Sequence, residues 1–310
     1  MGKTKYAIHP DFKRWSHMHP PIHKATLPAM QKLMGLLFTR EKSTADMRVE
    51  RWDIPVGDGV TIPALLYSPT TLRGSAPCLI DYHGGGFVFA ASPHHYALAR
   101  MYAAQAGCRV LMPDYRLAPK YPFPTAPEDA FAAYAWLLEH AGELFVDTNR
   151  VAVGGDSAGG TLTAAVCLMA EERGLPVPCA QMLIYPAVGL SEDSESMRKF
   201  TDTPMCNSKD AAKYDKLYMP DPSAGKPEYA APLKAESLAG LPPAYIETAE
   251  FDCLHDSGVQ YAQRLQEESV PAELYNTEGT MHGFDMVLES PIVQECIRRR
   301  VQFLKNVFAT

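Results

Sequence analysis

The chain has 310 residues, of which 46% are hydrophobic and 21% charged, and its formal net charge is −7. So many apolar residues can bury a large core, which excludes a disordered chain, and the acidic balance disfavours nucleic-acid binding. The short basic run at residues 298–300 is expected on a solvated helix face. Seven cysteines without a Cys-x-x-Cys pair are typical of reduced core thiols, so we expect a cytoplasmic protein. We expect no secretory signal, because no apolar region follows the charged N-terminus, and no membrane partner, because no segment reaches about 18 apolar residues.

Residues 1–45 are predicted to form a helical segment of a cap. Apolar residues recur there at helical spacing and would give the helix one apolar stripe: Leu27, Met30, Met34, Leu37 and Phe38. We expect this stripe to pack on the body of the protein while its edge lines a pocket. Histidines precede it at positions 17, 19 and 23, but no cysteine or carboxylate completes a ligand set, so we expect no metal site there.

Residues 46–187 are predicted to form the first part of an α/β core. Two strands fall within residues 47–68 and are joined by a glycine-containing turn at 57–59. Strands and helices then alternate, with strands over 77–82, 110–113, 151–153 and 180–185 and helices over 96–106, 128–140 and 157–172. This alternation predicts a mostly parallel central sheet with helices on both faces.

The alternation stops between residues 188 and 235, where the chain is polar, acidic and rich in proline. We predict that this insertion of short helices joins residues 1–45 to form the cap. Residues 236–310 resume the core with strands over 244–248 and 272–275 and helices over 257–268 and 291–307. Candidate pocket walls are large apolar or aromatic residues near the expected active site and in the cap: Phe87, Phe89, Met205, Tyr214 and Tyr218.

The most specific motif is the run Gly-Asp-Ser-Ala-Gly at residues 155–159, with Ser157 at its centre. It follows one predicted strand and opens a predicted helix. A serine on a tight strand-to-helix turn between glycines is typical of the nucleophile elbow of α/β-hydrolases. The glycines leave room for the strained turn, and the helix behind it directs free N–H groups at the serine. A phosphate-binding loop does not fit, since Gly160 stands where that loop requires lysine.

Polar residues follow three predicted strands at their carboxyl ends, where function collects in α/β sheets. Ser157, Asp252 and His282 follow the strands over 151–153, 244–248 and 272–275. Serine, acid and histidine come in the chain order of an α/β-hydrolase triad. In that triad His282 accepts the serine proton and Asp252 orients the imidazole ring. Because the base must be neutral, activity is expected to fall as the pH drops through roughly 6 to 7.

From about residue 75 to the C-terminus, the chain resembles the hormone-sensitive-lipase-like family of bacterial carboxylesterases. The matching segments are His-Gly-Gly-Gly at 83–86, Asp-Tyr-Arg-Leu-Ala-Pro at 114–119, Phe-Pro at 123–124, Glu-Asp-Ala at 128–130, Gly-Asp-Ser-Ala-Gly-Gly at 155–160 and His-Gly-Phe at 282–284. The resemblance implies an α/β-hydrolase fold, with a mostly parallel sheet under a helical cap.

The same resemblance implies roles for residues around the triad. The backbone N–H groups of Gly84 and Gly85 are expected to join that of Ala158 in an oxyanion hole. We expect His83 to fix the glycine loop, and Asp114 and Arg116 to hold a neighbouring loop rather than contact substrate.

The acid segment departs from the family pattern, which usually reads Asp-Pro-Leu-x-Asp. Cys253 stands here in place of the proline. Asp252 is the matching position and Asp256 is the alternative. Asp252 lies nearer the strand end, whereas Asp256 precedes the predicted helix over 257–268 and would cap it. We therefore assign the acid to Asp252.

Together these features predict a serine carboxylesterase for short- to medium-chain acyl esters that needs neither cofactor nor metal. The expected partner is a small-molecule ester, and a homodimer is left open. Two other classes are compatible with the sequence. An amidase, peptidase or acyltransferase would use the same triad, and a non-catalytic protein that binds small molecules would share the fold.

Overall fold

The computed structural model describes residues 5–57, 59–190 and 193–310, so that Asp58 in the predicted turn lies outside it. Within these residues, eight strands form one sheet in the order β1-β2-β4-β3-β5-β6-β7-β8. Strands β3 to β8 run parallel to one another, and β2 is antiparallel to both of its neighbours. The strands are β1 (Met47–Pro55), β2 (Thr61–Pro69), β3 (Ala76–Tyr82), β4 (Arg109–Pro113), β5 (Val146–Asp156), β6 (Ala180–Ile184), β7 (Ala244–Phe251) and β8 (Ala272–Met281).

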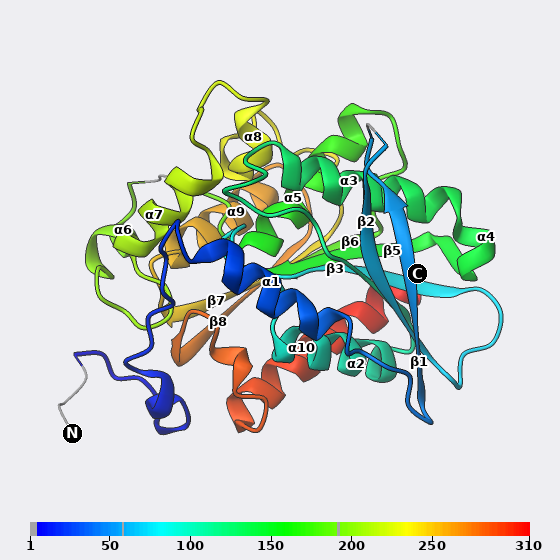
Figure 1. The fold of residues 1–310 in the computed structure, drawn as a ribbon, viewed down its shortest axis with the longest axis horizontal. Coiled ribbons are helices and arrows are strands. Elements are labelled where there is room, and N and C mark those ends of the chain that lie inside the picture. Colours follow the sequence, from blue (N-terminus) through cyan, green and yellow to red (C-terminus); the bar gives the residue numbers. More distant parts are fainter. Residues whose placement is uncertain (1–4, 58, 191–192) are drawn as a thin grey trace.

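Helices cover both faces of the sheet, as the alternation predicted (Figure 1). Helices α2 (Pro93–Ala106) and α10 (Pro291–Phe308) pack on one face. The other face carries α3 (Thr125–Glu139), α5 (Ala158–Glu172) and α9 (His255–Glu267). Short elements were not predicted individually, since one or two turns give too little periodicity: α4 (Ala141–Leu144), η1 (Pro10–Trp15), η2 (Pro232–Lys234) and η3 (Phe284–Met286).

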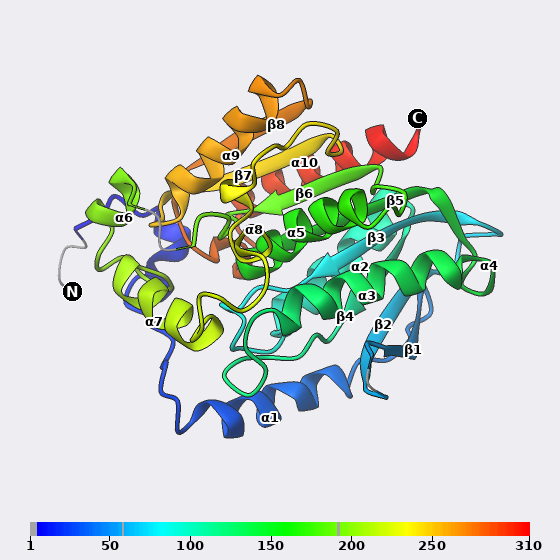
Figure 2. The ribbon, with the colours of Figure 1, turned by 90° about the horizontal axis from the view of Figure 1, so that it is seen from above.

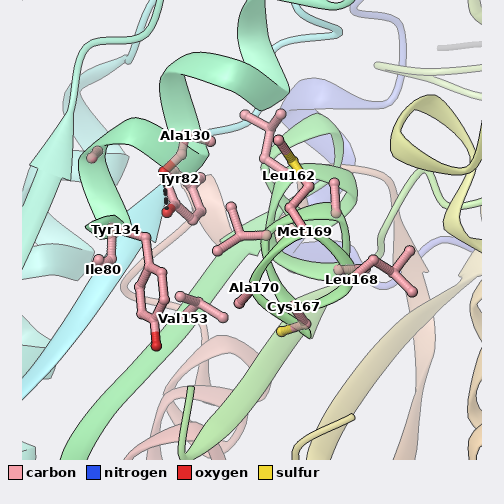
Figure 3. Packing of buried hydrophobic residues seen from close by; sticks show 14 of the residues in the cluster. Ile80, Tyr82, Ala130, Tyr134, Val153, Leu162, Cys167, Leu168, Met169 and Ala170 are labelled. Atoms are coloured by element: carbon pink, nitrogen blue, oxygen red, sulfur yellow. Dashed lines mark hydrogen bonds between the residues drawn. The ribbon is translucent and has the colours of Figure 1, made fainter. Parts of the chain in front are cut away.

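The core around α5 shows why this helix can lie against the centre of the sheet. Every residue from 158 to 170 is buried, and most are small or aliphatic. Figure 3 shows Leu162 and Cys167 of this helix in one apolar cluster with Val153 of the strand that precedes it. Tyr82 also enters this core, and its hydroxyl donates to the Ala130 carbonyl at 2.9 Å. The packing fixes the helix whose first residue follows Ser157.

Helices α1 (Leu27–Phe38), α6 (Glu195–Lys199) and α7 (Ser208–Tyr218) come from two separate parts of the sequence and lie near the carboxyl ends of the parallel strands (Figure 2). Helix α8 (Pro227–Ala230) instead packs at the C-terminal end of α5, where the Tyr229 hydroxyl donates to Glu172. Leu27 and Phe38 of α1 are buried against the body, whereas Leu33 is 67% exposed. The predicted stripe therefore packs as expected at its two ends.

Three strands, β5, β7 and β8, are several residues longer than the sequence pattern predicted. β7 extends to Phe251 and β8 to Met281, so Asp252 and His282 follow their strands directly. Six of the seven cysteines are buried, as expected of core residues, and all seven are free thiols in the structure. Across the described ranges, we find no helix with the length and apolar character needed to span a bilayer.

Candidate active site

Ser157 sits on a strained turn between β5 and α5. Its backbone φ is +53°, in a region that residues with a side chain rarely adopt. A Cβ added at Gly155 would lie 2.4 Å from the Tyr82 carbonyl oxygen, and one at Gly159 only 1.7 Å from the same atom. Glycine is therefore required on both sides of the serine, because strand β3 passes directly beside the turn.

The side chains of Ser157, His282 and Asp252 meet at the carboxyl edge of the sheet. His282 Nε2 lies 2.9 Å from Ser157 Oγ, and His282 Nδ1 lies 2.6 Å from Asp252 Oδ2. Asp252 is fully buried, and its other oxygen accepts the Leu254 N–H at 3.0 Å. An imidazole with its proton on Nδ1 would donate to Asp252 and accept from the serine hydroxyl.

The alternative acid, Asp256, is directed elsewhere. One of its oxygens faces His255 Nδ1 at 2.9 Å, and the other accepts the Ser196 N–H at 2.8 Å. Its predicted capping role is wrong, because α9 already begins at His255 and its N-cap residue is Leu254. The structure thus brings Asp252, and not Asp256, to the histidine.

The charge of His282 depends on its carboxylate neighbour. Burial alone would lower the pKa of His282, but the charge of Asp252 and the hydrogen bond to it outweigh burial. The net effect raises the pKa of His282 above its ordinary value of 6.5. Asp252 therefore stabilises the imidazolium form of the ring.

The glycine loop at residues 84–86 follows β3 and lies beside Ser157. Gly85 and Gly86 have φ of +126° and +59°. The Gly84 N–H donates to Asp156 Oδ1 at 2.8 Å, so the prediction of Gly84 as an oxyanion donor is wrong: this N–H is already bonded. Within the described residues, we see no hydrogen-bond acceptor for the N–H groups of Gly85, Gly86 and Ala158.

Asp156 is a residue whose part in the site the sequence reasoning missed. Besides the Gly84 N–H, its carboxylate faces His95 Nε2 at 3.2 Å. His95 Nδ1 accepts the Ser92 N–H at 2.9 Å, so the ring proton lies on Nε2 and points to Asp156. Burial opposes ionisation of Asp156, but the hydrogen bonds from the His95 ring and from the Gly84 N–H hold its pKa below the usual range. The sequence feature that could have indicated this role is that Asp156 directly precedes Ser157.

Of the other residues expected to hold loops, His83 and Arg116 make contacts that fit this role. His83 is buried, its ring stacks on Tyr115 with centroids 4.4 Å apart, and burial lowers its pKa to about 4. The Arg116 guanidinium pairs with the buried carboxylate of Asp129, with Nη2 2.6 Å from Oδ1. Asp114 is partly buried, and desolvation raises its pKa to about 6; its role in holding the loop stays a prediction.

A second cluster of buried charged residues contacts His282 through the ring of Tyr185. Tyr185 packs on the His282 ring with centroids 4.8 Å apart, and its hydroxyl donates to Asp285 at 2.5 Å. Asp285 also accepts from Arg300, which has no exposed surface and pairs with Glu247 as well. The expectation that residues 298–300 lie on a solvated face is therefore wrong for Arg300, because α10 turns this residue toward the sheet.

A cavity of about 340 Å³ opens beside Ser157 and His282. Its lining is mostly apolar and includes Phe87, Phe89 and Tyr214 of the predicted walls. Six methionines contribute from segments far apart in the sequence: Met18, Met30, Met34, Met197, Met205 and Met286. The predicted wall residue Tyr218 is instead buried, with its ring stacked 3.6 Å from that of Phe87.

One group of described residues has the atoms to ligate a metal, namely His94, His95 and Asp156, whose ligand atoms lie within 4.8 Å of one another. Hydrogen bonds already engage this group, since His95 contacts Ser92 and Asp156, and Asp156 accepts from Gly84. The histidines at 17, 19 and 23 form no such group within the described ranges.

Comparison with known proteins places this geometry in a family. A family model described as alpha/beta hydrolase fold matches residues 79–286. The chain belongs to this family. It is 37% identical to the esterase LipI of Mycobacterium tuberculosis over 74% of this chain and 72% of LipI. It is 35% identical to the carboxylesterase NlhH of the same species, over 84% and 83% of the two chains.

Solved structures agree with this assignment. The crystal structure of esterase LipW from Mycobacterium marinum matches with a TM-score of 0.89 and 27% identity, and covers 98% of this chain and 97% of LipW. The α/β-hydrolase fold expected from the motifs is therefore correct.

Proposed function

We propose that this protein is a serine carboxylesterase that hydrolyses short- to medium-chain acyl esters through an acyl-enzyme. The observation that carries the proposal is the contact of 2.9 Å between Ser157 Oγ and His282 Nε2, with His282 held by the buried Asp252. The esterase names of the relatives agree with this chemistry.

In the first half-reaction, His282 Nε2 takes the proton of the Ser157 hydroxyl as its oxygen attacks the ester carbonyl carbon. The resulting imidazolium is stabilised by Asp252. Collapse of the tetrahedral intermediate breaks the ester bond, and His282 gives its proton to the leaving alcohol. In the second half-reaction, His282 takes a proton from water, and the hydroxide attacks the carbonyl carbon of the acyl-enzyme. Collapse of this second tetrahedral intermediate breaks the bond to Ser157 Oγ, which takes the proton back from His282 as the acid leaves.

The oxyanion of both intermediates needs hydrogen-bond donors already in place. We assign this role to the N–H groups of Gly85, Gly86 and Ala158, of which Gly86 replaces Gly84 in the predicted set. The assignment rests on the bond from Gly84 to Asp156, which leaves the next two N–H groups of the loop for substrate. Each such donor typically contributes about 100- to 1000-fold to kcat.

The volume and the mostly apolar lining of the cavity favour a substrate with an uncharged acyl or alcohol group of moderate size. Its methionine side chains are flexible and polarisable, so they can adapt to chains of different length. Residues 1–45 and 188–235 both contribute to this lining, which supports their assignment as one cap over the body formed by residues 46–187 and 236–310. The acidic chain and its free cysteines support a cytoplasmic location.

Matched p-nitrophenyl esters and anilides with acyl chains of C2 to C16 test the proposal. We expect ester turnover to be fastest at short to medium length, anilide turnover to be far slower, and EDTA to leave both rates unchanged. Ser157→Ala, which keeps the fold, should lower kcat by roughly 10⁴- to 10⁶-fold. Anilide cleavage at a rate comparable to that of the ester would identify an amidase instead, and no turnover of any ester would favour a binding protein.

A further inference from the structure

Two cysteine side chains meet between the acid segment and the segment that joins α6 to α7. The Sγ atoms of Cys206 and Cys253 lie 3.9 Å apart, although the residues are 47 positions apart in the chain. Cys253 follows Asp252 directly and occupies the position of the family's usual proline. From this contact we infer that Cys206 and Cys253 form an oxidisable dithiol, which a small peroxide converts to a disulfide.

The dithiol has a route to small molecules through the substrate cavity. Cys206 lines that cavity and is 6% exposed, whereas Cys253 lies behind it and is 1% exposed. The reagent therefore meets Cys206 first and Cys253 resolves the product. Four other cysteines have no exposed surface at all: Cys78, Cys108, Cys167 and Cys296. Cys179, which directly precedes β6, is partly exposed and makes a natural comparison.

The chemistry balances with hydrogen peroxide as the oxidant. The Cys206 thiolate attacks one peroxide oxygen, the O–O bond breaks, and the departing hydroxide takes up the thiol proton as water. The Cys253 sulfur then attacks the resulting sulfenic acid, the S–S bond forms, and the S–O bond breaks. The second hydroxide leaves as water with the proton of Cys253. Two thiols are oxidised and one peroxide is reduced to two waters.

Bond formation must draw the two segments together, because an S–S bond is about 2 Å long, shorter than the present separation. The turn that carries Cys206 is held by neighbours: Thr203 Oγ1 donates to the Cys206 carbonyl, and the Met205 N–H donates to the Met18 carbonyl at 2.7 Å. Met205 and Met18 both line the cavity. Oxidation would therefore fix the cap to the acid segment and hold Met18 and Met205 in place, so that the cavity could no longer widen for large acyl groups.

Mass spectrometry after peroxide treatment tests the dithiol without reference to catalysis. Trypsin would release peptides 200–209 and 235–264, each with one cysteine. In Cys179→Ser protein treated with peroxide, we expect these peptides joined by a disulfide, two fewer free thiols after denaturation, and full reversal by dithiothreitol. Cys206→Ser and Cys253→Ser should each abolish the link. Absence of the joined peptides at a dose that oxidises Cys179 in the wild-type protein would overturn the inference.

Thermal unfolding and chain-length selectivity test whether the disulfide fixes the cap to the acid segment. The disulfide would close a long loop, so the oxidised protein should unfold roughly 5 °C higher than the reduced one. The expected effect on selectivity rests on the proposed esterase function. The ratio of kcat/KM for an octanoate ester to that for an acetate ester should fall about tenfold on oxidation. If the ratio is unchanged in protein shown to carry the disulfide, the disulfide does not restrict the cavity and this part of the inference is refuted. Reduced protein that cleaves no ester would refute the esterase proposal alone.

Discussion

Two histidine–aspartate pairs flank Ser157, and they differ in what the second ring nitrogen contacts. In the pair of His282 and Asp252, Nδ1 faces the carboxylate and Nε2 faces the serine hydroxyl. In the pair of His95 and Asp156, Nε2 faces the carboxylate and Nδ1 accepts a backbone N–H at the start of α2. The first pair can move a proton to and from the serine, whereas the second has no free nitrogen for the reaction.

The difference shows that a histidine beside a carboxylate is not in itself a base for catalysis. Asp156 is turned toward the glycine loop, where it binds the Gly84 N–H. We infer that this pair positions the loop whose following N–H groups bind the oxyanion, and that it acts through Gly85 and Gly86 rather than on the substrate. Loss of each pair should therefore affect different steps.

Removal of the charge on Asp252 is expected to have the largest effect of the carboxylate variants. Asp252→Asn retains the shape of the side chain but favours the wrong imidazole tautomer, so kcat should fall by about 10⁴-fold. Asp256→Asn is the matched control and should stay within about twofold, because that carboxylate contacts His255 and Ser196 instead. Steady-state kinetics with p-nitrophenyl butyrate measure both. Equal losses would contradict the assignment of Asp252.

Asp156→Asn should have an intermediate effect, a loss of about 10- to 100-fold in kcat with little change in KM, since the loop would loosen without losing a donor outright. Binding of a boronic acid that mimics the tetrahedral intermediate should weaken by a similar factor. If Asp156 were merely structural, its replacement would change KM or the unfolding temperature, and the loss in kcat would not match the loss in affinity for the boronic acid. That outcome would remove Asp156 from the oxyanion site.

The dependence of activity on pH should be the most gradual effect. His282 works as a base only when neutral, and Asp252 raises its pKa, so kcat/KM should rise with pH with a midpoint above 6.5. The midpoint is therefore expected above the value of about 6.5 that an unperturbed histidine would give. The pair at His95 should not add a second limb, since it makes no contact with the serine. A flat profile from pH 5 to 9 would contradict a histidine base.

The parts of the site that follow strand ends were predictable from the sequence. Ser157, Asp252 and His282 each come after an apolar run, and parallel strands bring their carboxyl ends to one edge of the sheet. The same rule identified Asp252 over Asp256, although the pattern ended β7 three residues early, at 248 rather than at Phe251. Glycine positions around the serine were also readable, because only glycine fits beside the Tyr82 carbonyl.

Other parts depend on contacts that no local pattern encodes. The orientation of the Asp156 carboxylate decides which glycine N–H remains for substrate, and that orientation is set by His95 from a different helix. Arg300 was expected in solvent, yet it pairs with Glu247 of β7, 53 positions earlier, and with Asp285 of η3, 15 positions earlier. The methionine lining likewise gathers from several separate segments.

Covalent labelling with a fluorophosphonate tests the central claim most directly, since such a reagent captures a serine only when a base and an oxyanion hole activate it. The account predicts one phosphonyl group on Ser157, mapped by mass spectrometry, with loss of activity in proportion to labelling. His282→Ala should label at a rate lower by several orders of magnitude. A label on another residue, or full esterase activity in protein fully labelled at Ser157, would contradict the account.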